Sequence, residues 1–279
     1  METSYCSGST CKRPGWKSPA AGVAFAAMLI LAACSTRTEP EAAQIKMTSR
    51  ADTVAMQVLQ ATGGPEAWAG VRYIRFDFAV EREGAQRPAV RHLWDRHEGR
   101  YRVEWTRGSD TTVVALFNVN TREGHAFVNG TEAGVDEAAI LETAYQRFIN
   151  DSYWLMAPTK LFDPGVTRTY LPDSSSSDTE MIHLAFADVG LTPGDQYWIE
   201  VDRNSGDMVK WTYVLQGSGA RSSSYNWTDY RNFEMPSGTV RLAQRKESVT
   251  APVAILTEVH ALPPSVPDEL FANPEMAME

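Results

Sequence analysis

Apolar and polar side chains alternate with a period of two residues along most of the chain from Val71 onward. Ile74, Phe76, Phe78 and Val80 alternate with polar or small residues, and similar runs recur almost to the C-terminus. Successive side chains of a β-strand point to opposite faces of a sheet, so this pattern predicts strands with one apolar face. Turn residues separate the runs and no helices alternate with them, which predicts an antiparallel meander.

The expected strands share this alternation and are bounded by glycine-rich or polar turns. They cover residues 71–80, 89–95, 101–105, 111–119, 125–128, 166–171, 180–187, 195–202, 207–216, 222–230, 239–247 and 253–262.

Two segments have helical periodicity instead. Ser49 and Asp52 are spaced as in a capping box, apolar residues over 51–59 fall on one helical face, and Gly63-Gly64 ends this helix. A second helix is expected from Asp136 to about Ile149, followed by a strongly apolar stretch over residues 153–156. Both helices have an apolar face that must be buried against another element.

A sheet of about a dozen strands must curl or close, because strongly twisted open sheets rarely exceed roughly ten strands. We therefore predict a mainly β fold with inserted helices: a curled antiparallel sheet, or incomplete β-barrel, of about 11–12 strands with a helical lid. Residues 49–262 would form this one domain. Residues 263–279 would form a C-terminal tail that docks Leu270 and Phe271 and then frays.

The N-terminal region resembles a secretory signal. Basic residues at 12, 13 and 17 precede an uncharged apolar run from Ala20 to Ala33, which is shorter than the roughly 20 residues of a transmembrane helix. The run ends in Leu31-Ala32-Ala33-Cys34, which resembles the lipobox of bacterial lipoproteins. This resemblance implies cleavage after residue 33, lipidation of Cys34 and a polar tether over residues 34–48. An ordinary signal peptide that ends near a cysteine is the alternative.

The lipobox resemblance also predicts a membrane partner and a location. The acyl chains on Cys34 would hold the protein at a membrane, since several chains anchor a protein stably. Under the sorting rule known for enteric bacteria, an aspartate after the lipidated cysteine retains a lipoprotein at the inner membrane. Ser35 occupies that position, which predicts the outer membrane.

Charge and cysteine content exclude several classes of function. The net charge of the whole sequence is −9, and loss of residues 1–33 would remove three basic residues and one acidic residue. An acidic surface repels a phosphate backbone, so nucleic acid is not an expected partner. Cys6 and Cys11 would leave with the signal and Cys34 would be acylated. The mature chain would then have no thiol nucleophile, no disulfide and no cysteine-ligated zinc.

His92, Asp95 and His97 come closest to a metal-binding set. In a strand, Asp95 and His97 share one face while His92 points to the other, and no further ligand at suitable spacing completes the set. We therefore expect no metal.

Residues 202–207 resemble the start of a calcium loop. Thr212 stands where an EF-hand requires glutamate, so a hairpin turn with Gly206 in a left-handed conformation fits better. The sequence contains no nucleophile elbow, zinc-protease motif or phosphate-binding glycine loop. We expect neither a cofactor nor an enzymatic activity.

Aromatic residues are plentiful on the predicted strands and the middle helix. Core packing explains any one of them, whereas a group of them could line a ligand cavity between the sheet and the helix. Trp198 alternates with Tyr197, Ile199 and Val201, so either the tryptophan or the other three face away from the main core.

The order of these segments resembles the lipoprotein-carrier family. The stretch from Gly190 to Asp202, with its hairpin return through Trp211, is similar to strand pairs in outer-membrane lipoprotein-sorting-like proteins. The stretch from Asp229 to Phe233, followed by Pro236 and a further strand, looks like the same group. The resemblance spans roughly residues 49–262 and implies an incomplete barrel with a helical lid that shelters acyl chains.

From this resemblance we expect a non-catalytic protein that binds a lipid or other hydrophobic ligand. Strand parity then suggests which side chains line or cover the cavity: Phe76, Phe78, Trp105, Phe117, Leu141, Tyr145 and Phe148. Two alternatives stay open. One is an envelope interaction or scaffold protein with a filled core, and the other is an enzyme, including a carbohydrate-active enzyme with paired acids.

Overall fold

The structure, a computed structural model, describes residues 47–186, 194–219 and 221–278. These residues belong to one compact unit, Ile45–Glu279, which contains the whole sheet and its apolar core. A unit with its own complete core is able to fold without the residues that precede it. Cys34, the predicted signal and the tether up to residue 46 lie outside the described residues. None of the described helices is both long and apolar enough to cross a bilayer.

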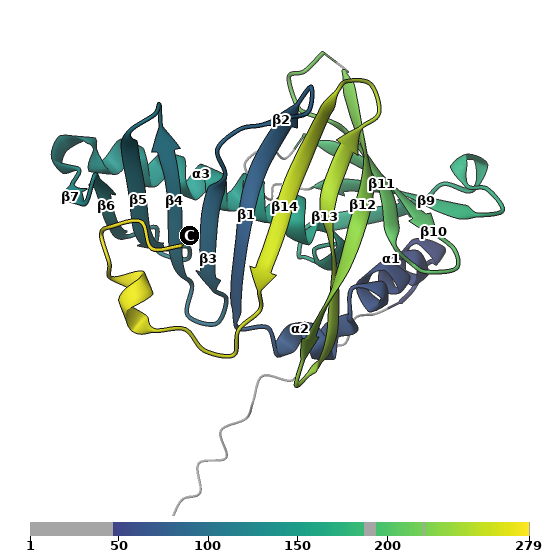
Figure 1. The fold of residues 1–279 in the computed structure, drawn as a ribbon. Coiled ribbons are helices and arrows are strands. Elements are labelled where there is room, and N and C mark those ends of the chain that lie inside the picture. The colour runs from purple at the N-terminus through teal and green to yellow at the C-terminus, as the bar shows by residue number, and fades with distance from the viewer. Residues whose placement is uncertain (1–46, 187–193, 220, 279) are drawn as a thin grey trace, which may run out of the picture. The chain divides into compact units, whose positions relative to one another are not determined.

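Fourteen strands form a single antiparallel sheet in the order β7-β6-β5-β4-β3-β1-β14-β13-β12-β11-β10-β9-β8, with β2 paired to β1 (Figure 1). The strands are β1 (Tyr73–Arg82), β2 (Ala85–Gln86), β3 (Val90–Asp95), β4 (Arg100–Arg107), β5 (Thr111–Asn118), β6 (Gly124–Val128), β7 (Thr131–Glu132), β8 (Val166–Tyr170), β9 (Thr179–Phe186), β10 (Gln196–Asp202), β11 (Met208–Val214), β12 (Ser222–Met235), β13 (Gly238–Ser248) and β14 (Val253–Ala261).

The hydrogen-bonded order ends at β7 on one side and β8 on the other, so the described sheet does not close into a barrel. The predicted fold class is confirmed. The sheet has more strands than the predicted 11–12 because β2 and β7 contain two residues each. Strands of that length are too short to show an alternating pattern.

Helix α1 (Arg50–Ala61) begins at the predicted capping box. Asp52 N–H donates to Ser49 Oγ at 3.1 Å, and Ser49 N–H donates back to the Asp52 carboxylate at 3.1 Å. Gly63 ends the helix with φ +114°, and any side chain at this position would also collide with the Thr239 carbonyl oxygen. Both constraints require glycine. The next residue starts the short helix α2 (Gly64–Ala69).

Helix α3 (Glu137–Met156) continues about two turns beyond its predicted end. The apolar stretch over residues 153–156 continues the helix, because no glycine or proline interrupts it before Pro158, within the short 3₁₀ turn η2 (Ala157–Thr159). The predicted end near Ile149 is therefore wrong, and the longer helix reaches from β6 to β11.

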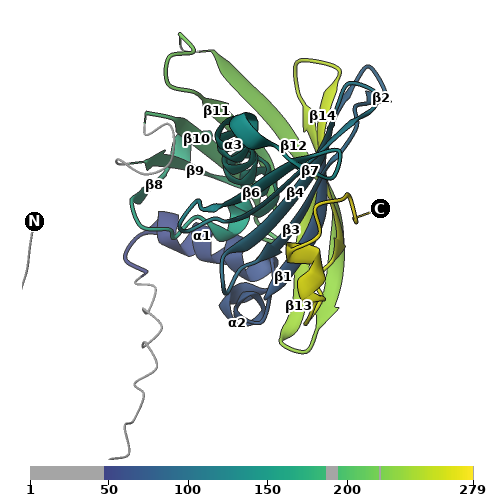
Figure 2. The same ribbon diagram turned by 90° about the vertical axis from the view of Figure 1, so that its left-hand side faces the viewer.

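We call the sheet face that α3 covers the inner face. At one end of the helix Glu137 accepts a hydrogen bond from Ala126 N–H of β6, at 3.2 Å. Along its length it contacts β5, β6, β13 and β14, and near its other end Trp154 packs on Trp211 of β11 with ring centroids 4.7 Å apart. Figure 2 shows α3 enclosed by the curled sheet, with α1 and α2 at one end. Tyr197, Ile199 and Val201 face this layer, and Trp198 points to the opposite side.

The pairing between β13 and β14 is the shortest link among the long strands. Only residues 245–247 of β13 pair with residues 254–256 of β14. Beyond this ladder, side chains bridge the two strands. Val259 N–H donates to Gln244 Oε1 at 2.6 Å, and Thr257 Oγ1 donates to the Ala243 carbonyl oxygen at 3.3 Å. This seam divides the sheet into a half from β7 to β14 and a half from β13 to β8.

The C-terminal segment covers the outer face of β3, β4 and β5. After the 3₁₀ turn η4 (Asp268–Phe271) the chain continues over β4 to Met278, which is buried (Figure 1). The expected fraying after Phe271 is therefore not seen among the described residues. This cover explains why five consecutive residues of β4, Tyr101–Trp105, are buried although the strand was expected to have one polar face.

A fully buried ion pair holds this segment. Arg102 Nε donates to Glu104 Oε1 at 2.5 Å, and neither side chain is exposed. The Arg102 guanidinium also donates to the carbonyl oxygens of Leu270, Asn273 and Glu275, while the Glu104 carboxylate accepts the N–H groups of residues 277 and 278. Both charges are thus saturated by backbone groups of one segment.

Substitution Arg102→Met is expected to lower the free energy of unfolding by about 3–5 kcal/mol, because it leaves the Glu104 carboxylate buried without its partner. Urea denaturation of the Ile45–Glu279 unit measures this. The control is Arg231→Met, which removes an exposed arginine paired with Asp229 at 3.0 Å, and should change stability by less than about 1 kcal/mol. Equal effects of the two substitutions would contradict the proposed role of the buried pair.

Candidate functional site

The layer between the inner face and α3 contains all seven side chains that were predicted to line a cavity. On the sheet side these are Phe76, Phe78, Trp105 and Phe117, which are buried. On α3 they are Leu141, Tyr145 and Phe148, which are half-buried and pack against the same core. Strand parity therefore assigned the correct face. A role of these residues in ligand binding stays a prediction.

Phe148 is the centre of the ring contacts on this side of the layer. Its ring centroid lies 4.9 Å from that of Tyr101 and 5.1 Å from that of Trp94, both nearly edge-on, and 6.0 Å from that of Tyr145. Tyr101 and Trp94 were not among the predicted lining residues. Trp94 lies directly opposite Ile74 on the neighbouring strand, and Tyr101 lies opposite Trp94, so all three share one face of the sheet. The same parity rule could have found them. Rings in contact fill this part of the layer, so a ligand must separate them.

A second group of rings fills the other half of the layer. Tyr153 and Trp154 of α3 contact Trp211 at 5.5 and 4.7 Å between centroids, and Trp154 contacts Tyr225 at 4.9 Å. Burial raises the pKa of Tyr153, so its phenol stays neutral at any physiological pH. The Nε1 atom of Trp211 is buried and has no hydrogen-bond partner among the described residues.

A buried polar link joins α3 to β3 and β4. His92 Nδ1 lies 2.9 Å from the hydroxyl oxygen of Tyr101, and His92 Nε2 lies 3.2 Å from Asp151 Oδ2 of α3. The second contact has ion-pair distance without hydrogen-bond alignment. All three side chains are buried, and the imidazole stacks on Phe76 with centroids 4.4 Å apart. The group ties the helix to the sheet at one polar point inside an apolar layer.

The three residues considered for a metal do not come together. His92 belongs to the inner-face link, whereas the Asp95 carboxylate binds Arg72 and Arg100 on the other side, at 3.2 and 2.8 Å. Burial alone would raise the pKa of Asp95, but the hydrogen bonds from the two arginines outweigh it and lower the pKa to about 2. Among the residues the structure describes, no group of three or more metal-ligating side chains is assembled.

The calcium-like stretch forms a hairpin turn, as predicted. The Asp202 carboxylate accepts the N–H groups of Asn204 and Ser205 at 2.9 and 2.8 Å, and Gly206 has φ +76°. The carboxylate is therefore occupied by its own turn.

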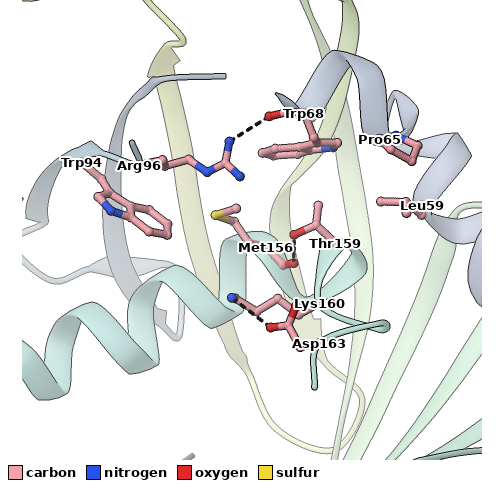
Figure 3. A pocket seen from close by; sticks show the side chains of 9 residues that line it. All are labelled: Leu59, Pro65, Trp68, Trp94, Arg96, Met156, Thr159, Lys160 and Asp163. Carbon is pink, nitrogen blue, oxygen red and sulfur yellow. Dashed lines mark hydrogen bonds and ion pairs between the residues drawn. The ribbon is translucent and has the colours of Figure 1, made fainter. Parts of the chain in front are cut away.

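A pocket of about 260 Å³ lies where α1, α2, the end of β3 and the end of α3 meet (Figure 3). It is lined by Leu59, Pro65, Trp68, Trp94, Arg96, Met156, Thr159, Lys160 and Asp163. Sequence reasoning missed this pocket, because its walls come from four segments that are distant along the chain. Trp94 connects it to the layer under α3, since its ring also contacts Phe148.

Arg96 forms the polar wall of this pocket. Its Nη1 donates to the carbonyl oxygens of Trp68 and Val71 at 2.9 and 2.6 Å, and its guanidinium carbon lies 5.5 Å from the Trp68 ring and 6.0 Å from the Trp94 ring. Burial lowers the pKa of Arg96 from its usual range, but an arginine remains charged.

Lys246 is a fully buried cation that the sequence did not reveal. Its ammonium donates to the Ala243 carbonyl oxygen at 2.9 Å and to Thr257 Oγ1, and it lies 4.7 Å from the centre of the Trp227 ring. Burial places its pKa well below the ordinary value. The side chain closes part of the seam between β13 and β14.

Comparisons with known proteins give remote likenesses. No protein-family model and no curated protein matches the chain. A LolA superfamily protein from Nitrosomonas europaea is 10% identical over 80% of this chain and 98% of its own, with a TM-score of 0.44. A DUF1329 family protein from Desulfovibrio piger is 8% identical with the same coverages and a TM-score of 0.45. MucB is 12% identical over 76% of this chain and 94% of its own, with a TM-score of 0.22.

Substitution Asp151→Leu is expected to lower the free energy of unfolding by about 3 kcal/mol, because it breaks the buried link to His92. The triple variant Tyr101→Phe, His92→Phe, Asp151→Leu removes every polar atom of the link and should recover most of that loss. Urea denaturation of the three proteins decides between the outcomes. A triple variant that is less stable than the single one would show that the polar group holds α3 in place by itself.

Proposed function

We propose that this chain is a lipid-anchored envelope protein that binds a lipid or other hydrophobic ligand under α3 without catalysing a reaction. The observation that carries the proposal is the continuous aromatic path from the pocket into the inner layer. Trp94 lines the pocket and contacts Phe148, which lies among the residues predicted to cover a ligand. Apolar walls with a few polar groups are typical of small-molecule sites.

The geometry is suited to an extended chain and not to a compact ligand. At about 260 Å³ the pocket lies below the roughly 300–1,000 Å³ that is usual for a drug-sized ligand. A flexible acyl chain can pass between rings that a rigid ligand would have to displace as a group. About ten methylene groups removed from water, at roughly 0.8 kcal/mol each, correspond to micromolar affinity before the cost of moving α3 is subtracted.

Helix α3 would act as the lid. Its contacts with the sheet include the Glu137–Ala126 hydrogen bond at one end, ring contacts through Phe148 and Trp154, and the polar link through Asp151 between those two rings. Opening of the helix around Phe148 separates rings that each contribute roughly 0.5–1.5 kcal/mol beyond their buried area. Such a cost is small enough to be offset by ligand binding, so uptake and release would be governed by movement of this helix.

The second candidate function, an envelope interaction or scaffold protein, is based on a filled core. Phe76, Trp105 and Phe117 are each at most 6% exposed, so the inner layer holds no large empty space around them. That packing favours an envelope interaction or scaffold protein in which α3 is a permanent part of the core. The two candidates differ in whether an acyl chain can enter the layer.

Ligand binding is tested by native mass spectrometry of the Ile45–Glu279 unit purified from a bacterial host and offered oleyl alcohol. We expect an added mass that Phe148→Asp removes, because a carboxylate in the ring layer repels an apolar chain. The control Gln146→Asp places the same charge on the exposed face of α3 and should retain the ligand.

Thermal unfolding of each variant shows whether it is still folded. A folded wild-type protein without bound lipid, and without uptake of oleyl alcohol, would favour the filled-core candidate.

Lipidation is tested by metabolic labelling of the full-length chain with an alkyne fatty acid in a Gram-negative host. We expect the label on the wild-type chain and its loss in Cys34→Ser, because the thiol of Cys34 is the proposed acceptor. Outer-membrane fractionation of the same cells tests the location predicted from Ser35. Label that persists in Cys34→Ser would rule out this anchor.

A further inference from the structure

Arg96 is a cation without a carboxylate partner at the wall of the pocket. The neighbouring arginines Arg72 and Arg100 both pair with Asp95, at 3.2 and 2.8 Å. For Arg96, by contrast, the described part of the chain supplies no acidic group within 4.0 Å, and only one of its nitrogens, Nη1, forms hydrogen bonds. A partly buried guanidinium with unused donors is a good site for an anion that accepts two hydrogen bonds.

The surroundings of Arg96 add one further group with the same preference, Lys160. The indole N–H of Trp94 is buried and has no acceptor among the described residues, so it is not presented to a ligand in the pocket. Trp68 differs, because its Nε1 already donates to Thr62 at 3.0 Å. Lys160 lines the pocket as well and is balanced by Asp163 at 3.4 Å (Figure 3). The lining therefore contains two cations and one anion, and the unbalanced charge is that of Arg96.

We propose that the pocket binds the anionic headgroup of a single-chain amphiphile, a carboxylate or a phosphate, with Arg96 as its main partner. The inference rests on the proposed function, because the apolar chain of that ligand would pass Trp94 toward Phe148 and lie under α3. The pocket volume of about 260 Å³ accommodates a small head and the first part of a chain. Headgroup selection is thus assigned to the pocket, and chain binding to the inner layer.

Three probes with the same 18-carbon chain separate the head from the tail: oleate, oleyl phosphate and oleyl alcohol. Binding to the Ile45–Glu279 unit is measured by isothermal titration calorimetry at pH 8. At this pH oleate and oleyl phosphate are anions and oleyl alcohol is neutral. We expect at least one of the two anions to bind about tenfold more tightly than the alcohol, because a charge-assisted hydrogen bond forms in a partly buried pocket. The tighter of the two identifies the headgroup.

Substitutions then locate the source of the preference. Arg96→Met should remove most of the preference for the anionic probe, while the affinity for oleyl alcohol stays within about twofold. Arg96→Lys keeps the charge without the paired donors and should retain part of this preference. Lys160→Gln should reduce it modestly. The control Lys210→Gln removes a lysine paired with Glu200 at 3.7 Å outside the pocket, and should have no effect.

Each outcome has a defined meaning. If Arg96→Met does not fold, Arg96→Lys and Lys160→Gln decide the question. If the wild-type protein binds the alcohol as tightly as both anions, Arg96 only caps the end of α2, and this inference fails while the proposed function stands. If none of the three probes binds, the proposed function fails and this inference is overturned with it.

Discussion

The short ladder between β13 and β14 is the constraint on which the rest of the structure depends. Three residue pairs join two halves of a fourteen-stranded sheet, and the side chains of Gln244, Lys246 and Thr257 add hydrogen bonds across the seam. The backbone hydrogen bonds at the seam alone therefore define the relation of the two halves only weakly. Helix α3 supplies that relation, because it packs on Tyr101 in one half and on Trp211 in the other. The apolar layer under α3 is therefore both the hydrophobic core and the contact that holds the two halves of the sheet together.

This double role explains where polar groups are found in the layer. A purely apolar contact lets a helix slide or rotate, whereas the His92–Asp151 contact defines one position of α3 on the sheet. The aromatic rings on either side provide buried apolar area, and the polar contact fixes the position of α3 along the sheet. On the outer face the Arg102–Glu104 pair does the same for the C-terminal segment, because its hydrogen bonds to five backbone groups fit only one placement of that segment.

The sequence predicted the features that depend on local periodicity. The antiparallel class, the capped start of α1 and the inward direction of Phe76 and Trp105 all follow from patterns within ten or so residues. It did not predict features made by distant segments. The outer face of β4 has Arg102 and Glu104 at its polar positions, and nothing in that strand indicates that residues 270–278 cover them. Arg96 stands in a turn, and only its meeting with Trp68 and Met156 makes it part of a pocket.

The pairing of β1 with β14 has a consequence for the order in which the molecule can be assembled. Phe78 lies opposite Thr257 at the middle of the sheet, so the centre is built from the first and the last long strands. During translation β1 is synthesised early and β14 almost at the end, so one edge of β1 has no strand to pair with until β14 is made. High contact order of this kind delays folding until translation is nearly complete. If the chain is exported, as the proposed function requires, such a delay would keep it in the unfolded state that passage through a narrow translocation channel demands.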